Sequence, residues 1–316
     1  MARAFLSSGD LIADRRASYA DMLFESGDHV AAADLMRQAL EITPEWTAGL
    51  YRLGEMEEAA GDEDAAAETW RRLLELDPDD RFGATLKLAA SGYAVVPDNP
   101  PTAYVETLFD AYAPTFEAAL LDKLHYRVPE LLAKAIKAAA PGRHYQSMLD
   151  VGCGTGLMGD YFRADVDHMA GMDLSEAMLQ KAEEKHVYDR LFKGDVNELD
   201  YPEGSADLII AADVFVYVGD LDRAFARLVH ALGPRGLFAF SVETHADDGE
   251  LILQSSLRYT HSEGYVRRLL AEHGLAPATI GREAIRFDRG EPLQGLIVVA
   301  GRLISLSGTS GGPSSR

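Results

Sequence analysis

The spacing of apolar residues changes twice along the chain. The first hundred residues read as short helices joined by Gly-Asp and Pro-led turns. Segments 102–124 and 127–142 then carry apolar residues at the 3.6-residue period of helices. From residue 147 onward, short apolar runs alternate with helical segments. The runs expected to form strands are 147–152, 168–173, 190–195, 206–213, 236–243, 278–288 and 294–303.

Strands separated by helices predict an α/β fold, with a doubly wound, Rossmann-like and mostly parallel sheet covered by helices on both faces. The last two runs leave no room for a crossover helix, so we expect a C-terminal antiparallel strand. The prolines of "VVPDNPP" stop regular structure and mark a boundary. The predicted organisation is an all-α helical-repeat domain at 1–94, a linker at 95–101, an α/β domain at 102–303 and a disordered tail at 304–316.

A repeat of 34 residues runs through the helical segment. Each unit reads as a helix, a Gly-Asp turn, a second helix and a Pro-led turn, and residues 81–93 are expected to add a capping helix. This pattern resembles the tetratricopeptide repeat. The resemblance implies a groove for a peptide, a protein partner or self-association. The matching pairs are Gly27 and Gly61, Asp28 and Asp62, Ala32 and Ala66, Leu40 and Leu74, and Pro44 and Pro78.

Charge and cysteine content narrow the classes of function. Acidic residues outnumber basic ones by 51 to 30, and a net charge of −21 repels nucleic acid and anionic lipid. Cys153 is the single cysteine, which fits a reducing compartment. No apolar run has the length of a signal peptide or a membrane span. We therefore expect a cytoplasmic protein that binds neither nucleic acid nor membrane, and we expect no metal site.

The stretch 148–162, "MLDVGCGTGLMGDYF", carries the clearest chemical signal. Gly152, Gly154 and Gly156 alternate where the first strand turns into a helix, so backbone amides can approach a ligand closely. A dinucleotide-binding loop would read Gly-x-Gly-x-x-Gly, but Leu157 stands at the sixth position. Asp150 precedes the loop and favours cationic groups over a pyrophosphate. These features count against the nicotinamide oxidoreductases that share this topology.

Acidic residues end the first four predicted strands. Asp150, Asp173, Asp195 and Asp213 follow one another at intervals of 23, 22 and 18 residues. In open parallel sheets, ligands bind beyond the carboxyl ends of the strands. The spacing therefore predicts one site along this edge of the sheet.

"LDVGCGTGLMG" resembles the signature loop of class I S-adenosylmethionine-dependent methyltransferases. The resemblance implies that the loop faces the methionine part of the cofactor, that Asp173 accepts the ribose hydroxyls and that Asp195 meets the adenine amino group. With the repeats, it points to a bacterial subgroup of tetratricopeptide-containing methyltransferases. The cofactor-binding residues it implies are Asp150, Gly152, Gly154, Gly156, Asp173, Leu174, Met178, Asp195, Val196 and Asp213.

The catalytic candidates are His261 in "RYTHSEGY", His245 after the fifth strand, and Tyr112 on a helix that folds over the cofactor in relatives of this shape. A hydroxyl acceptor needs a base, whereas an amine or thiolate needs only positioning. Cys153 is expected to pack within the loop. Further candidates are Phe215, Tyr217, His125, Tyr126, Glu243, Arg258 and Tyr259.

The resemblance predicts methyl transfer from S-adenosylmethionine to a small-molecule acceptor, with S-adenosylhomocysteine as the product. One alternative is a protein methyltransferase whose repeats recruit a peptide or protein substrate. Another is a scaffold without catalytic activity, in which the sheet is vestigial. The acceptor, the methylated atom and the oligomeric state stay open at this point.

Overall fold

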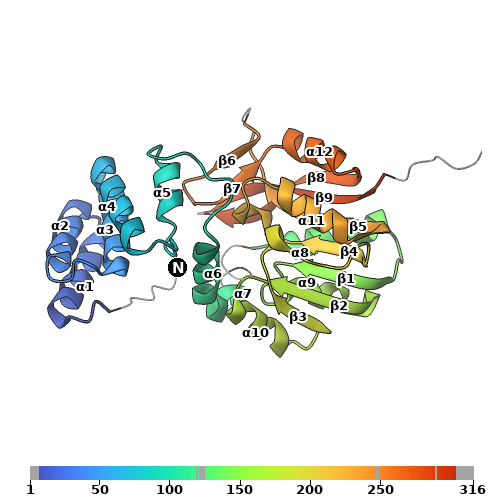
Figure 1. The fold of residues 1–316 in the computed structure, drawn as a ribbon, viewed down its shortest axis with the longest axis horizontal. Helices are drawn as coiled ribbons and strands as arrows, with labels where there is room; N and C mark the ends of the chain where they lie inside the picture. Colours follow the sequence, from blue (N-terminus) through green and yellow to red (C-terminus); the bar gives the residue numbers. More distant parts are fainter. Residues whose placement is uncertain (1–6, 119, 121–124, 247–248, 289, 304–316) are drawn as a thin grey trace, which may run out of the picture.

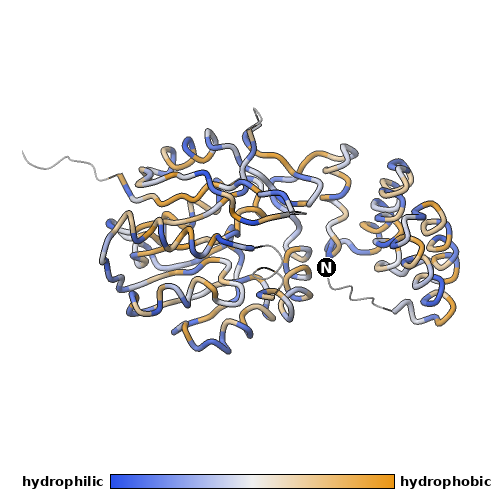
Figure 2. Tube along the Cα trace, turned by 180° about the vertical axis from the view of Figure 1, so that it is seen from behind, coloured by the Kyte–Doolittle hydropathy of each residue, from blue (hydrophilic) through white to orange (hydrophobic). Residues whose placement is uncertain are grey.

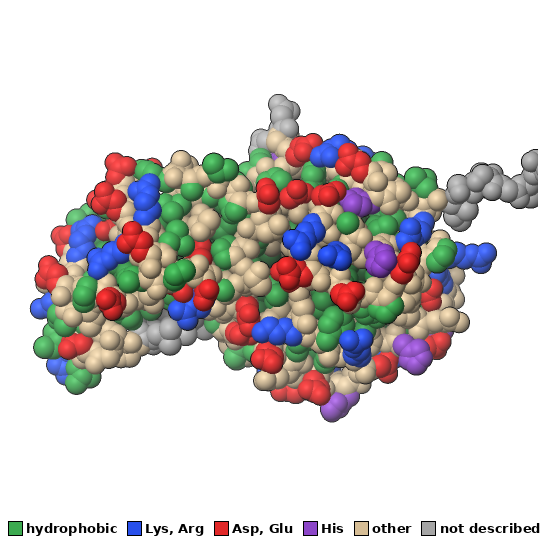
Figure 3. All heavy atoms as spheres, viewed as in Figure 1, with side chains coloured by type: hydrophobic (Ala, Val, Ile, Leu, Met, Phe, Trp, Pro, Cys, Tyr) green, Lys and Arg blue, Asp and Glu red, His purple; other side chains and the backbone are tan. Residues whose placement is uncertain are grey.

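The computed structural model describes residues 7–118, 120, 125–246, 249–288 and 290–303. Within them, a group of N-terminal helices stands beside an α/β body, and α5 is the helix of that group nearest to the body (Figure 1). Acidic side chains, with Lys and Arg between them, are spread over both parts on the face shown in Figure 3. No helix in these ranges has the length and apolarity needed to cross a bilayer. The predicted tail at 304–316 lies outside the described residues.

The N-terminal helices repeat the geometry of their turns as well as their sequence. Gly27 and Gly61 each follow a helix in the left-handed region, with φ of +87° and +79°. Asp28 and Asp62 then cap the next helix, because each carboxylate accepts the amide three residues on. That these units are tetratricopeptide repeats stays a prediction. The helices are α1 Leu11–Glu25, α2 His29–Leu40, α3 Thr47–Ala60, α4 Glu63–Leu76 and α5 Ala84–Ala90.

The packing of α3 against α4 predicts an effect on stability. A Cβ at Gly54 would lie 2.4 Å from Cη2 of Trp70, whose side chain is fully buried. Alanine normally stabilises a helix relative to glycine, but here the clash opposes that gain. We expect Gly54→Ala to lower the free energy of unfolding by about 1–3 kcal/mol, measured by urea titration. Gly264→Ala is the control, because a Cβ there meets nothing within 4 Å. Equal effects of the two substitutions would contradict this account.

The described part of the body contains a seven-stranded sheet with the order β3-β2-β1-β4-β5-β9-β8. The five neighbouring strands β3, β2, β1, β4 and β5 pair in parallel, and β9 pairs antiparallel with both β5 and β8. The mostly parallel sheet and its antiparallel C-terminal strand are thus confirmed. The strands are β1 Tyr145–Val151, β2 Val166–Asp173, β3 Arg190–Lys193, β4 Ala206–Ala211, β5 Leu232–Glu243, β8 Leu275–Asp288 and β9 Glu291–Arg302, with a separate hairpin of β6 Leu251–Leu253 and β7 Tyr259–His261.

Helices cover both faces of the sheet, and apolar residues concentrate in its strands (Figure 2). Successive residues of β1 point to opposite faces, so Met148 packs with α8 and α9 while Leu149 packs with α11 and α12. The helices of the body are α6 Thr102–Tyr112, α7 Phe116–Ala118, α8 Val128–Ala139, α9 Leu157–Phe162, α10 Glu176–Glu184, α11 Asp222–Ala231 and α12 Glu263–Glu272, with 3-10 turns η1 Ala113–Thr115, η3 Arg163–Asp165, η4 Val196–Glu198 and η5 Phe215–Tyr217.

The segment between the helices and the body is held in place by hydrogen bonds. Tyr259 donates its hydroxyl to the carbonyl of Pro97 at 2.9 Å, and the amide of Asp220 donates to the carbonyl of Asp98 at 2.7 Å. In addition, Leu86 of α5 packs in one apolar cluster with Tyr104 of α6 and with Leu257. The predicted linker at 95–101 therefore follows the surface of the body. The domain boundaries themselves stay predictions.

Candidate cofactor and acceptor site

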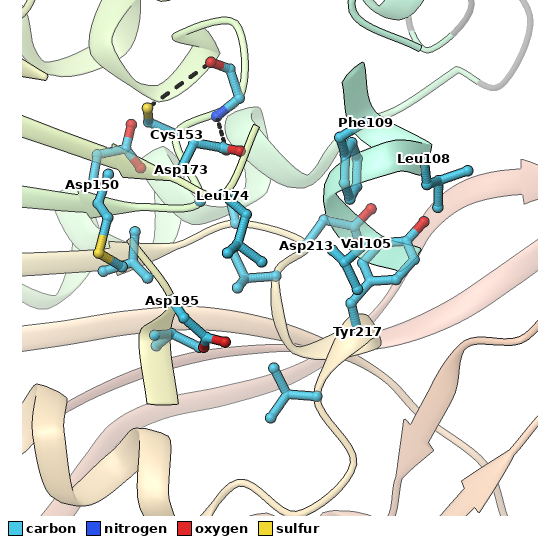
Figure 4. Close-up of a pocket in the computed structure, with 18 of the residues that line it drawn as sticks. Val105, Leu108, Phe109, Asp150, Cys153, Asp173, Leu174, Asp195, Asp213 and Tyr217 are labelled. Atoms are coloured by element: carbon cyan, nitrogen blue, oxygen red, sulfur yellow. Dashed lines mark hydrogen bonds between the residues drawn. The ribbon is translucent and has the colours of Figure 1, made fainter. Parts of the chain in front are cut away.

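A cavity of about 470 Å³ opens beyond the carboxyl ends of β1, β2 and β4. Its size falls in the usual range for small-molecule sites. In Figure 4, Asp150, Asp173 and Asp195 lie on one side of the cavity, and Val105 and Phe109 of α6 lie on the other. The cavity thus lies at the edge of the sheet that the acidic spacing predicted.

The glycine loop forms one wall. After Val151 ends β1, Gly152, Gly154 and Gly156 adopt φ of +61°, +53° and +90°, and α9 starts at Leu157. A Cβ at Gly152 would lie 2.5 Å from Val214 Cγ2, so no larger residue fits there. Gly152 and Gly154 line the cavity. Gly156, predicted to bind the cofactor, instead provides the left-handed N-cap of α9 and does not line the cavity.

Asp150 is a buried carboxyl with one unpaired oxygen. Its Oδ2 accepts the hydroxyl of Tyr188 at 2.5 Å, whereas its Oδ1 has no partner among the described residues. Burial, together with the charge of Asp173, raises the pKa of Asp150 to about 7. A cationic group placed beside Oδ1 would satisfy this oxygen. This wall therefore suits a ligand that carries an ammonium.

Asp173 ties the end of β2 to the glycine loop. Its Oδ2 accepts the amide of Gly154 at 2.8 Å, and its Oδ1 accepts the amide of Ser175 at 2.9 Å. Burial raises the pKa of Asp173 above its ordinary value. Each carboxylate oxygen keeps a further lone pair for a ligand hydroxyl. Leu174 also lines the cavity, but Met178 is fully buried and does not, so its predicted cofactor contact is not supported.

Asp195 and Val196 line the far end of the same wall. Asp195 was expected to end the third strand, but β3 ends at Lys193. Its Oδ1 instead accepts the amide of Asn197 and caps η4, and Thr102 donates to its Oδ2 at 3.3 Å. Asp195 therefore combines a capping role with a place on the cavity wall.

Helix α6 lies across the cavity from the acidic wall (Figure 4), and its role as a lid over the cofactor stays a prediction. Asp110 accepts the hydroxyl of Ser175 at 2.6 Å, and Lys193 pairs with Glu106 at 2.5 Å. These contacts connect α6 to the same strand ends that carry the acidic wall. Tyr112 lines the cavity and contacts Phe116 edge to face. A role for Tyr112 in the reaction stays a prediction.

The end of the cavity away from Asp195 is charged. Asp213 lies two residues beyond β4 with φ of +60°, and its Oδ2 accepts Nη1 of Arg286 at 2.6 Å. Arg286 also donates to Glu243 and is almost fully buried. Asp213 was predicted to bind the cofactor. It does line the cavity, and it forms an ion pair with Arg286, which lines the cavity together with Arg258.

Neither predicted catalytic histidine lines the cavity. His261 is fully buried, bonds through Nε2 to the carbonyl of Gly219 and has its pKa lowered to about 4 by burial. His245 bridges the hydroxyl of Thr260 and the carbonyl of Gly249. Both rings therefore hold together the strands and turns around the β6–β7 hairpin. Catalytic roles for His261 and His245 therefore stay untested predictions, and the contacts of both rings are structural.

Several residues that line the cavity belong to no motif from which the sequence could have predicted them. Arg286 comes from β8, Ser256 from the β6–β7 turn, Leu108 from α6 and Asn99 from the predicted linker. No motif or spacing connects these four positions. Arg258 is one of several further candidates that the sequence offers.

Comparison with known proteins identifies the class of the domain. Residues 149–240 match the family model described as a methyltransferase domain. The chain is 26% identical over 169 residues to malonyl-acyl-carrier-protein O-methyltransferase of Salmonella typhimurium, covering 54% of this chain and 66% of that protein. It is 31% identical over 153 residues to trans-aconitate 2-methyltransferase of Deinococcus radiodurans, covering 46% and 57%.

Solved structures share the fold. A Burkholderia thailandensis 1,6-didemethyltoxoflavin-N1-methyltransferase with bound S-adenosylhomocysteine aligns with a TM-score of 0.52 at 21% identity, covering 66% of this chain and 93% of that one. The cyclase SpnF aligns with a TM-score of 0.54 at 16% identity, covering 66% and 98%. The second match illustrates that one fold can carry more than one reaction.

Residues 149–240 therefore match a methyltransferase domain, whose cofactor is S-adenosylmethionine, and they form most of a Rossmann-like sheet. The cofactor of such a domain fits the cavity, because the unpaired Oδ1 of Asp150, the glycine loop and Asp173 lie along one wall. The chain spans 47% to 66% of the length of the first curated relatives it matches. The matched family region lies outside helices α1–α5.

Proposed function

We propose that this protein is an enzyme that transfers a methyl group from S-adenosylmethionine to a small-molecule acceptor and leaves S-adenosylhomocysteine. The observation that carries the proposal is the buried Asp150, which lines the cavity at the glycine loop and whose Oδ1 has no partner among the described residues. When bound, the cofactor supplies a methyl group already activated by a positively charged sulfur. The protein then has to align the acceptor and exclude water.

Each part of the cavity wall would bind a different part of the cofactor. Asp150 would face the ammonium of the methionine part, Asp173 the ribose hydroxyls, and Asp195 with Val196 the adenine. Helix α6 would exclude water from above, since its apolar side chains Val105, Leu108 and Phe109 line the cavity. The end that holds Arg258 and Arg286 is left for the acceptor.

A small acceptor agrees with two further observations. The cavity of about 470 Å³ has a size suited to small ligands. The names of two relatives, malonyl-acyl-carrier-protein O-methyltransferase and trans-aconitate 2-methyltransferase, describe acyl or acid acceptors. We further propose a cytoplasmic location, with the N-terminal helices available for a protein partner or for self-association.

The test uses the full chain with S-adenosylmethionine carrying a tritiated methyl group and a panel of carboxylic acids, phenols and amines. We expect binding of S-adenosylmethionine in a calorimeter, no binding of a nicotinamide dinucleotide, and transfer of label to at least one panel member. A folded chain that does not bind S-adenosylmethionine would overturn the proposal. Binding of S-adenosylmethionine without transfer of label to any panel member would favour a scaffold.

A further inference from the structure

The β6–β7 turn brings an arginine to the acceptor end of the cavity. Leu257 lies in this turn with φ of +61°, and its side chain is buried with Leu86 and Tyr104. Ser256 and Arg258, on either side of Leu257, line the cavity. The carbonyl of Arg258 accepts the amide of Gln254 at 2.9 Å. The buried leucine and this bond therefore hold Arg258 at the acceptor end.

Arg258 and Arg286 differ in how far their donors are used. Arg286 is 3% exposed and is held between the carboxylates of Asp213 and Glu243. The guanidinium of Arg258 has one carboxylate near it among the described residues, Glu243, at 3.4 Å, and its side chain is 25% exposed. Because a guanidinium has five donors, Arg258 keeps most of them free for a ligand.

The free donors of Arg258 match one kind of acceptor group. The fork of a guanidinium binds a carboxylate with two parallel hydrogen bonds. The carboxylates of Asp213 and Glu243 already fix Arg286, so among the described residues that line this end Arg258 is the cation with capacity for a further anion. The two guanidinium groups at this end, those of Arg258 and Arg286, would repel a cationic amine.

The described residues that line the cavity around Arg258 include neither a histidine nor an ionised phenol that could serve as the base for a hydroxyl acceptor. Among the described residues that line the cavity there is no histidine. Burial raises the pKa of Tyr217, of Tyr126 and of Tyr104, so these phenols stay protonated at neutral pH. A carboxylic acid is already ionised at that pH and needs no base to accept a methyl group.

We propose that the acceptor is a small carboxylate, that Arg258 binds it, and that the product is its methyl ester. The inference rests on the proposed function and names its substrate class. A carboxylate oxygen forms a bond to the methyl carbon while the methyl–sulfur bond breaks, and the electron pair of that bond stays on sulfur. The negative charge of the acid and the positive charge of the sulfonium are lost together, and no proton moves.

The experiment compares the full-length wild type with Arg258→Gln. Trans-aconitate and malonyl-pantetheine are the carboxylate probes, and their amides are the neutral controls. Methyl esters release volatile tritiated methanol in mild alkali, whereas methyl ethers and methylamines keep their label. The control variant is Arg267→Gln, because Arg267 lies on α12 outside the cavity, is half exposed and pairs with Glu263.

We expect base-labile label on a carboxylate probe and none on its amide. Arg258→Gln should raise the KM for the acid by about 10- to 100-fold, the loss expected for a charge-assisted pair, with the Kd for S-adenosylmethionine unchanged. Arg258→Lys should recover part of the loss, and Arg267→Gln should behave as the wild type.

Three results would overturn the carboxylate proposal and leave the proposed function standing. The label could be base-stable or appear only on phenols or amines. The KM could be the same in Arg258→Gln. The variant could instead lose S-adenosylmethionine, which would assign Arg258 to the carboxylate of the cofactor. A wild type that binds S-adenosylmethionine but labels nothing, or that does not bind it, overturns both proposals.

Discussion

Asp173→Ala is expected to bind S-adenosylmethionine about 100-fold more weakly than the wild type. The carboxylate of Asp173 accepts the amides of Gly154 and Ser175, so it fixes the glycine loop relative to the end of β2. It also provides the acceptors that we assign to the ribose hydroxyls. Losing two hydrogen bonds to a charged group costs about 3 kcal/mol, which corresponds to this change in Kd. Isothermal titration calorimetry measures it directly.

The matched control for this variant is Asp160→Ala. Asp160 is an aspartate in the first turn of α9, close in sequence to the loop, but it pairs with Lys185 and does not line the cavity. Its replacement should leave the Kd unchanged. The fold of both variants is checked by urea unfolding, so a loss of binding can be separated from a loss of structure. Undiminished binding by a folded Asp173→Ala variant would contradict the assignment of Asp173.

The acidic wall was predictable because a parallel sheet turns sequence spacing into spatial proximity. The carboxyl ends of neighbouring parallel strands meet at one edge, so acids spaced by one helix and one strand converge there. Asp150 and Asp173 lie at strand ends as expected. Asp195 and Asp213 lie two residues beyond theirs, because the strands stop where the chain turns into η4 and into the left-handed residue at 213.

The acceptor end was less predictable because distant segments assemble it. Arg286 comes from a strand and Ser256 from a turn, and no local period relates them. The two histidines were chosen for their chemistry alone. Burial and backbone partners decide their role, and a short motif such as "RYTHSEGY" encodes neither.

Leu257 connects the turn that carries Arg258 to other parts of the chain. Its φ is +61°, a conformation in which glycine is normally favoured. This conformation is strained for leucine, and the side chain of Leu257 packs with Leu86 of α5 and Tyr104 of α6. The turn that carries Arg258 is thereby connected to both the helical part and the lid.

Asp150→Asn is expected to make the protein more stable at pH 8 and equally stable near pH 4. The pKa of Asp150 is about 7 in the folded chain against an ordinary value of 3.8, because burial penalises its charged form. Below pH 4 the carboxyl is protonated in both states and burial costs little. As the pH rises toward 7, the unfolded chain releases this proton first, so the wild type loses stability relative to the variant.

At pH 8 the difference in the free energy of unfolding should approach 4 kcal/mol, since about three pKa units separate the two states. Asparagine keeps an oxygen that can accept the hydroxyl of Tyr188, so the substitution removes mainly the charge. Urea titrations from pH 4 to 8 give the difference, and Asp160→Asn controls for the loss of one acid. A difference independent of pH would show that Asp150 does not carry this titration.

Asp150→Asn also tests whether the buried carboxylate of Asp150, which destabilises the fold when it is charged, serves to bind the cofactor. A charged Asp150 is unfavourable in its buried surroundings, but a cation beside its Oδ1 would favour the ionised form and lower its pKa. S-adenosylmethionine should therefore stabilise the wild type more at pH 8 than at pH 5, with release of a proton on binding. Asp150→Asn should lose this pH dependence and bind more weakly at pH 8. If the variant bound as tightly as the wild type at pH 8, the ammonium would have to lie elsewhere in the cavity.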